Sequence, residues 1–400
     1  MRQAAKKLSE SRSRQGDWEL VPLGSLAEFR NGVNFTKESF GRGIKVINVK
    51  DFQDRFRPDF GDLGEINPEG VIRDADLLHE GDIVFVRSNG NRQLIGRSLF
   101  ISKAAGAVTH SAFTIRARFS GTDVFPLFYA YLLRSHSVRQ ALSAHGGGTN
   151  INNLNQTILA SLPVLKPPLD VQLRIASSLS AYDELVENNT QRIKMLEDIA
   201  QTLFREWFVH FHFPAHPSAP LAEASTRREG WEVKKAKDII LRLKAGKVYK
   251  GSEVSEAGTI PVIDQSRDEI LGFHENQPDH IAEPGRPVII FGDHTCKMQM
   301  MVEPFSVGPN VVPFVSRDDI PTPYLFFLVR NLVETSEYKR HWGELTNKEV
   351  MVSPAELARK FALLVTPIFE QIDSLRRKNS ILRRTRDLLL PRLVSGEIVM

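Results

Sequence analysis

With 400 residues, 42% of them hydrophobic and 25% charged, the chain fits two to four globular domains and is neither disordered throughout nor a collagen. Its single cysteine, Cys296, excludes an internal disulfide and a cysteine-based zinc site, which favours a reducing compartment. No apolar run approaches the roughly 20 residues of a membrane span, and a net charge of +4 permits nucleic-acid binding without requiring it.

The predicted elements occur twice in the same order. Residues 1–17 are basic and polar, and we expect a disordered tail there. Trp18-Glu19-Leu20 then recurs as Trp231-Glu232-Val233, and each copy runs to a glycine, Gly32 or Gly246. The paired segments that follow are predicted strands at 44–47 and 260–263, β-rich segments at 82–86 and 287–291, proline-led apolar helices at 126–133 and 323–329, and the pairs Thr149-Asn150 and Thr346-Asn347. This order predicts two similar globular domains, at 18–170 and 230–366.

Each predicted domain is followed by a helix with apolar residues spaced alternately by four and three. The first helix is expected at 171–213 and the second, shorter one at 367–394, with a linker at 214–229 and a tail at 395–400. Such spacing over several heptads favours a coiled-coil seam, and one asparagine in each seam would fix the register. The alternative is that each helix packs on its own domain. The seam comprises Leu179, Val186, Asn189, Ile193, Leu196, Leu203 and Trp207 in the first helix, and Leu375, Asn379, Leu382, Leu389 and Leu393 in the second.

A second apolar stripe is expected on the first helix. Phe204, Phe208 and Phe211 lie on it, and a stripe of this kind suits a protein partner.

The sequence contains none of the common catalytic motifs. It lacks a Walker loop, a dinucleotide fingerprint and a Gly-x-Ser-x-Gly elbow. His210, His212 and His216 lie close together in the sequence. No aspartate, glutamate or cysteine lies between them to complete a set of metal ligands, so we expect no metal site. Asp293, His294 and Cys296 are better explained as a polar loop than as a nucleophilic pair. We therefore expect no catalytic residues and no chemistry performed by this chain.

Polar and basic side chains in the loops of both predicted domains suggest DNA binding. Arginine and lysine suit phosphates and guanine edges, and asparagine and glutamine suit adenine edges in the major groove. The candidates are Arg30, Asn31, Asn34, Arg87, Asn89, Asn91, Arg92, Thr149 and Asn150 in the first domain, and Lys250, Gln265, Arg267, Asp293, His294, Lys297, Asn347 and Lys348 in the second.

Several segments carry a family resemblance that spans nearly the whole chain. Residues 167–175, 183–189 and 203–208 resemble one conserved helical region of the specificity (S) subunits of type I restriction–modification systems, and residues 386–398 resemble a second. The loop Phe291-Gly292-Asp293-His294-Thr295 resembles one found in some of that family's recognition domains.

The resemblance implies an α+β fold. Two similar mixed α/β target recognition domains would be separated by two long antiparallel coiled-coil helices, with a pseudo-twofold internal repeat. Each domain would read one half of a bipartite, asymmetric DNA site, and the helices would dock two modification (methyltransferase) subunits.

The resemblance also implies cofactors, partners and location. This chain would bind no cofactor itself, whereas its partners would bring S-adenosylmethionine, ATP and Mg²⁺. Double-stranded DNA, the modification subunits and ATP-driven restriction subunits would be its partners, in the prokaryotic cytoplasm and away from any membrane. The assembled complex would methylate adenine and cleave unmodified DNA. Two alternatives remain open: a stand-alone nuclease using the Asp293–His294 loop, and a coiled-coil scaffold that binds no DNA.

Overall fold

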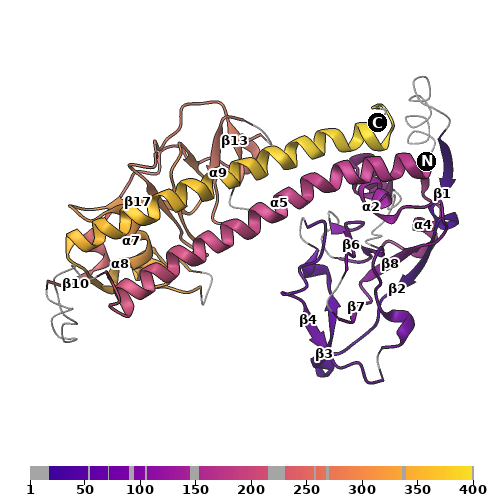
Figure 1. Cartoon of the computed structure of the whole chain (residues 1–400), viewed down its shortest axis with the longest axis horizontal. Helices are drawn as coiled ribbons and strands as arrows, with labels where there is room; N and C mark the ends of the chain where they lie inside the picture. Colours follow the sequence, from indigo (N-terminus) through magenta and orange to yellow (C-terminus); the bar gives the residue numbers. More distant parts are fainter. Residues whose placement is uncertain are drawn as a thin grey trace. The chain divides into compact units, whose positions relative to one another are not determined.

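The computed structural model describes residues 18–52, 55–70, 72–89, 94–103, 106–144, 153–214, 230–255, 258–266, 270–335 and 339–398. The chain divides into two compact units (Figure 1). The first unit combines residues 1–186 with 381–400, and the second contains residues 187–380. The expected tail at 1–17 and nearly all of the expected linker at 214–229 lie outside the described residues.

In the described residues of the first unit, the strands form three small sheets. The largest has the strand order β2-β8-β5-β6, a three-stranded sheet has the order β4-β3-β7, and β1 pairs with β9. Their bounds are β1 Glu19–Pro22, β2 Ala27–Asn31, β3 Phe40–Ile47, β4 Gly64–Ile66, β5 Ile83–Val86, β6 Ser98–Phe100, β7 Val108–His110, β8 Thr114–Phe119 and β9 Pro163–Lys166.

The second unit repeats this plan strand for strand. Its sheets have the orders β11-β17-β14-β15, β13-β12-β16 and β10-β18. The bounds are β10 Glu232–Lys235, β11 Ile240–Arg242, β12 Ile260–Ile263, β13 Ile270–His274, β14 Val288–Gly292, β15 Met298–Met301, β16 Ser306–Val307, β17 Val311–Ser316 and β18 Glu349–Val352. Each three-stranded sheet contains one parallel pair, β3 with β7 and β12 with β16, whereas the other pairs are antiparallel. The predicted duplication of the fold is therefore confirmed.

Short helices cover these sheets. The first unit has α2 (Pro126–Arg134), α3 (His136–Ala144) and α4 (Gln156–Ala160); the second has α6 (Ala236–Ile239), α7 (Thr322–Val329) and α8 (Trp342–Asn347). The proline-led apolar helices predicted from the sequence are α2 and α7, and a proline lies in the first turn of each, where its missing N–H costs nothing. Both helices bury nearly all of their side chains in the core of their own unit.

Two long helices contribute residues to both units. Helix α5 runs over Leu169–Phe204 and ends in a π-helical turn at Arg205–Val209, and α9 runs over Ala355–Val394. At 1.5 Å per residue, their 36 and 40 residues make them about 54 and 60 Å long. Within each unit the two helices lie side by side (Figure 1). They run antiparallel, since Asp183 meets Arg386 in the first unit and Glu197 meets Arg376 in the second.

The prediction that the second helix begins at 367 and is the shorter of the two is wrong. Helix α9 begins at Ala355, so Pro367 lies inside it and its first turns belong to the core of the second unit. Proline has no N–H to offer the carbonyl four residues before it, here that of Leu363. Neighbouring Thr366 instead donates its hydroxyl to the Ala362 carbonyl at 2.8 Å. The apolar face of Ala358, Phe361 and Val365 stays fully packed, and this burial outweighs the lost hydrogen bond.

The predicted seam residues take part in two kinds of packing. Asn189 donates its side-chain amide to Asn379 at 2.9 Å, and Asn379 donates in turn to the Thr190 hydroxyl. Leu179, Leu389 and Leu393 also pack into the core of the first unit, whereas Ile193, Leu196, Leu203 and Leu375 are buried or half-buried in the second. Val186 and Leu382 are half-buried. The helices thus pack on each other and on the globular parts at once.

Phe204, Trp207 and Phe208 do not form an exposed stripe. Their side chains are 5–7% exposed and contact Tyr324, Phe327 and Phe361 of the second unit. The prediction of a partner surface at Phe204 and Phe208 is therefore wrong, because the core of their own unit covers both rings.

Candidate nucleic-acid interface

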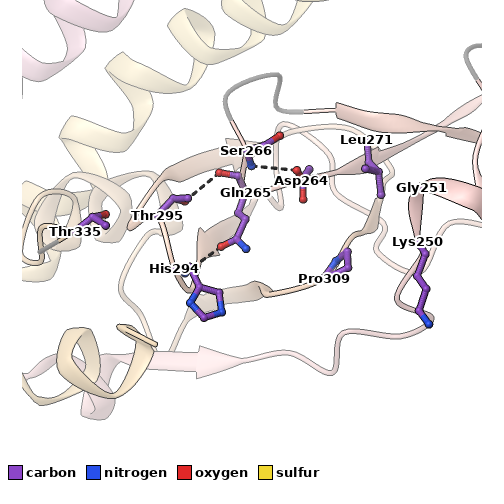
Figure 2. A pocket seen from close by; sticks show the side chains of 10 residues that line it. All are labelled: Lys250, Gly251, Asp264, Gln265, Ser266, Leu271, His294, Thr295, Pro309 and Thr335. Atoms are coloured by element: carbon purple, nitrogen blue, oxygen red, sulfur yellow. Dashed lines mark hydrogen bonds between the residues drawn. The ribbon is translucent and has the colours of Figure 1, made fainter. Parts of the chain in front are cut away.

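Loops that connect the strands of the second unit enclose an open hollow of about 580 Å³ (Figure 2). Asp264, Gln265 and Ser266 come from the β12–β13 connection, His294 and Thr295 from the β14–β15 turn, and Pro309 from the β16–β17 turn. Lys250, Gly251, Leu271 and Thr335 complete its lining. Three of the predicted DNA-binding residues, Lys250, Gln265 and His294, are thereby brought together.

Gln265 is held by hydrogen bonds on two sides. Its side-chain oxygen accepts from the His294 backbone N–H at 3.0 Å, and its main-chain carbonyl accepts from the Thr295 hydroxyl at 3.0 Å. A glycine at 292 makes this approach possible, because a Cβ there would lie 2.7 Å from the Gln265 Cβ and 2.5 Å from the Thr295 hydroxyl oxygen. The β14–β15 turn and the end of β12 therefore position one another.

Asp293 and His294 do not form a catalytic pair in this loop. Asp293 is 7% exposed, and its carboxylate accepts from the backbone N–H of Trp342 at 2.8 Å, at the start of α8. The ring of His294 is directed to the Lys339 carbonyl through Nδ1 at 3.0 Å. Asp293 thus orders the chain that leads into α8, and this arrangement gives the alternative of a nuclease site here no support.

Of the remaining candidates in the second unit, Lys297 lies at the same loops, whereas Asn347 and Lys348 lie at the end of α8, where the Lys348 carbonyl accepts from the Ala236 N–H. Lys297 donates its ammonium group to the Ser266 carbonyl at 3.1 Å, which ties the β14–β15 turn to the β12–β13 connection. Asn347, at the end of α8, donates to the Gly343 carbonyl, and Lys348 lies 3.7 Å from Glu344. Arg267 lies outside the described residues.

A basic segment that leads to Lys250 was missed in the sequence. Arg242, Lys244 and Lys247 precede Lys250, and all four are exposed. Within the described residues, Lys247 has a carboxylate partner, Glu253 at 3.2 Å, and its ammonium lies 4.3 Å from the centre of the Tyr249 ring. The close spacing of these cations just after the second tryptophan motif was the signal that could have identified them.

The candidates of the first unit are less exposed than their positions in loops suggested. Arg30 donates to Asp76 through two nitrogens, at 2.9 and 2.6 Å. Burial opposes ionisation of Asp76, but the Arg73 backbone N–H and the Arg30 guanidinium outweigh it and hold the pKa of this carboxyl below its usual value. Arg87 donates to the Ala112 carbonyl at 3.3 Å. Asn31 and Asn34 are exposed and Asn89 is half-buried, whereas Asn91, Arg92, Thr149 and Asn150 lie outside the described residues.

A buried histidine, His110, lies at the end of β7. His110 is fully buried, and its Nδ1 donates to the Thr114 hydroxyl at 2.9 Å while that hydroxyl donates to the Ser111 carbonyl. Its Nε2 has no partner among the described residues. Burial, joined by the nearby Arg116 guanidinium, lowers the pKa of His110 to about 3. The ring is therefore neutral in the folded protein.

We expect this histidine to make the protein sensitive to acid. Below pH ~6.5 an unfolded histidine takes up a proton that the folded one refuses, so the free energy of unfolding falls as the pH drops from ~6.5 towards 3. The loss amounts to a few kcal/mol, since one pKa unit corresponds to about 1.4 kcal/mol. Urea unfolding at pH 7, 5.5 and 4 should show this slope in the native protein and a smaller one in His110→Gln.

In the described part of the chain, no group of three or more histidine, cysteine, aspartate or glutamate side chains is arranged to hold a metal ion. None of the helices described has a stretch both long and apolar enough to cross a bilayer.

The fold is thus a duplicated mixed α/β unit with two long helices that contribute residues to both copies. Residues 15–198 match the family described as the type I restriction modification DNA specificity domain. This match covers most of the first unit, and over nearly its whole length the chain is similar to type I restriction–modification specificity subunits.

Individual relatives are similar to nearly the whole chain or to about half of it. The MjaIX specificity subunit of Methanocaldococcus jannaschii, a type I restriction enzyme subunit, is 27% identical over 96% of this chain and 94% of its own length. The EcoKI specificity subunit of Escherichia coli is 24% identical over 46% of this chain and 39% of its own. Among solved structures, the type I S subunit from M. genitalium has a TM-score of 0.56, with 17% identity over 96% of this chain and 97% of that one. That likeness supports the fold.

Proposed function

We propose that this chain gives a type I restriction–modification complex its DNA sequence specificity, with each recognition domain reading one half of a bipartite, asymmetric site. The observation that carries the proposal is the repetition of one strand order with different loop residues. At equivalent places the first unit has Arg87 and Asn89 after β5, whereas the second has Asp293 and His294 after β14. Two unlike half-sites require two domains with the same fold but different side chains at the DNA-contacting positions.

Within one recognition domain, different residues would contact the DNA backbone and the bases. Exposed cations such as Lys244 and Lys250 suit phosphates, which give affinity and register. The polar groups in the hollow, above all Gln265, suit base edges, which give specificity. The long helices α5 and α9 would set the spacing between the half-sites.

The same helices would dock two modification subunits. Large apolar side chains stay exposed along both: Leu173, Leu185, Met195 and Ile199 on α5, and Leu363, Leu364, Ile381 and Leu388 on α9, each 40–76% exposed. Exposed apolar surface of this extent on a helix is typical of a protein interface. The modification subunits would bring S-adenosylmethionine and methylate adenine, and restriction subunits would add ATP- and Mg²⁺-dependent cleavage, in the prokaryotic cytoplasm. This chain would contribute no catalytic group.

An exchange of one domain tests the proposal. Since α9 begins at Ala355, residues 230–353 can be replaced by the equivalent segment of a relative with both long helices intact. Modified adenines are then mapped across the genome of cells that express the hybrid with the modification subunits. We expect one half of the methylated site to change completely and the other half to stay the same. The proposal would be wrong if both halves were unchanged, or if both changed.

A further inference from the structure

We propose that Gln265 reads one base of the half-site bound by the second domain, and that it selects a base edge that presents a hydrogen-bond acceptor and rejects cytosine. This inference rests on the proposed function and adds to it the chemistry of one contact. It concerns only the side-chain amide at the end of β12 and the loop that holds it.

The orientation of the Gln265 amide is fixed by its surroundings. A glutamine amide has one accepting oxygen and one donating NH₂ group. The oxygen is used by the His294 backbone N–H, and the Thr295 hydroxyl holds the Gln265 main chain. Figure 2 shows the amide nitrogen on the opposite side from the bond to His294, towards the hollow. Among the described residues, no acceptor receives a hydrogen bond from this nitrogen.

The loop is constructed so that the amide cannot turn over. A flipped amide would place NH₂ against the His294 N–H, and two donors facing each other would leave both without an acceptor. Gly292 lets the β14–β15 turn come close to Gln265, since a Cβ at position 292 would lie 2.7 Å from the Gln265 Cβ, and this approach keeps the His294 N–H within reach of the amide oxygen. The side chain is half-buried and already ordered, so little of its conformational entropy is lost when DNA binds.

A fixed donor distinguishes the bases by what they present in the major groove. Guanine offers N7 and O6, thymine offers O4, and adenine offers N7, all of which accept a hydrogen bond. Cytosine offers only the donating N4 amino group. A cytosine placed against Gln265 would leave two donors facing each other, so the contact discriminates against that base. A glutamine free to rotate could accept from N4 and would lose this selectivity.

The substitution Gln265→Glu replaces the hydrogen-bond donor that faces the hollow with an acceptor and preserves the size of the side chain. One carboxylate oxygen still accepts from the His294 N–H, and the other replaces the NH₂ group with an acceptor, which suits cytosine N4. With the full chain assembled with its modification subunits, adenine methylation is mapped across the genome. We expect one position of one half-site to admit cytosine, and methylation of the original sites to fall about tenfold to a hundredfold, the range that one mismatched base pair costs.

Two further variants make the experiment decisive. Gln277→Glu makes the same charge change on the same domain, at an exposed position outside the hollow, and should leave the methylated sequence as it is. Gln265→Met keeps the length of the side chain without donor or acceptor and should relax the same single position. An unchanged base preference in Gln265→Glu would overturn the inference.

Other outcomes are equally informative. Loss of all methylation in both Gln265 variants, with Gln277→Glu active, would also overturn the inference, because Gln265 would then hold the loop together without reading a base. The proposed function fails separately: in that case the native chain itself directs no sequence-specific methylation, or the exchange of residues 230–353 leaves both half-sites unaltered.

Discussion

Asp183→Ala is expected to lower the free energy of unfolding by about 3–5 kcal/mol, the cost of leaving one partner of a buried ion pair alone. Asp183 lies on α5 with a side chain 7% exposed, and it pairs with Arg386 of α9, which is 19% exposed. It also accepts the hydroxyl of Tyr131 on α2 at 2.5 Å. Burial and the adjacent Asp183 carboxylate raise the pKa of Tyr131, so its hydroxyl stays protonated and donates. One carboxylate thus joins both long helices to the core of the first unit.

Urea unfolding followed by circular dichroism measures this effect. Asp170→Ala is the matched control, because Asp170 also lies on α5 and pairs with an arginine, Arg174, at 2.8 Å, but both side chains are about half-exposed or more. An exposed pair of this kind contributes at most about 1 kcal/mol. Equal losses in the two variants would show that the Asp183 pair is solvated and does not join the helices. Replacing Tyr131, Asp183 and Arg386 together by apolar residues should recover much of the loss.

The sequence was sufficient to predict the duplicated fold because its strongest signals are local. A tryptophan, a glycine, a strand and a proline-led helix recur in order, and each reports on backbone geometry near itself. Gly32 is an example of a residue whose role is not local. Only glycine fits at this position, because a Cβ there would lie 2.2 Å from the carbonyl oxygen of His110, which is 78 positions later in the chain. The recurrence identified the position, but only the structure gives the reason.

The start of α9 could not be predicted for a related reason. Pro367 resembles the first residue of a helix, and the residues before it were assigned to the domain. What keeps the helix intact across this proline is the burial of Phe361 and Val365 against the second unit, which is tertiary packing. Local propensity favoured a helix start at 367, and burial outweighed it.

The sequence identified candidate residues by their type, but it could not predict the contacts that each of them makes. Asp293 and Arg30 are candidates in the sequence because they are charged and lie near predicted loops. Their roles depend on distant partners: Asp293 orders the start of α8, 49 residues later, and Arg30 pairs with Asp76, 46 residues later. Gln265 was selected as one amide among several. Its fixed orientation follows from Gly292 and His294, neither of which is near it in sequence.

The second large effect is expected for Phe361→Ala, with a loss of about 3–5 kcal/mol, the usual cost of removing a buried phenylalanine ring. Phe361 lies on α9 and is fully buried. Its ring contacts those of Phe204, Trp207 and Phe208 at the end of α5, at centroid distances of 5.7, 6.1 and 5.2 Å. It also contacts Tyr324 and Phe327 of α7. Removing the ring leaves a cavity where α5, α7 and α9 meet.

Leu363→Ala on the same helix is the control for Phe361→Ala. Leu363 is 76% exposed, so its truncation should change the free energy of unfolding by no more than ~0.5 kcal/mol. Since Trp207 borders the cavity, its fluorescence should shift in Phe361→Ala and stay constant in Leu363→Ala. If the two long helices were held in the second unit by their mutual contacts alone, Phe361→Ala would cost little and Asn379→Ala much more. A large loss for Phe361→Ala shows instead that the aromatic cluster anchors the helix ends to the recognition domain.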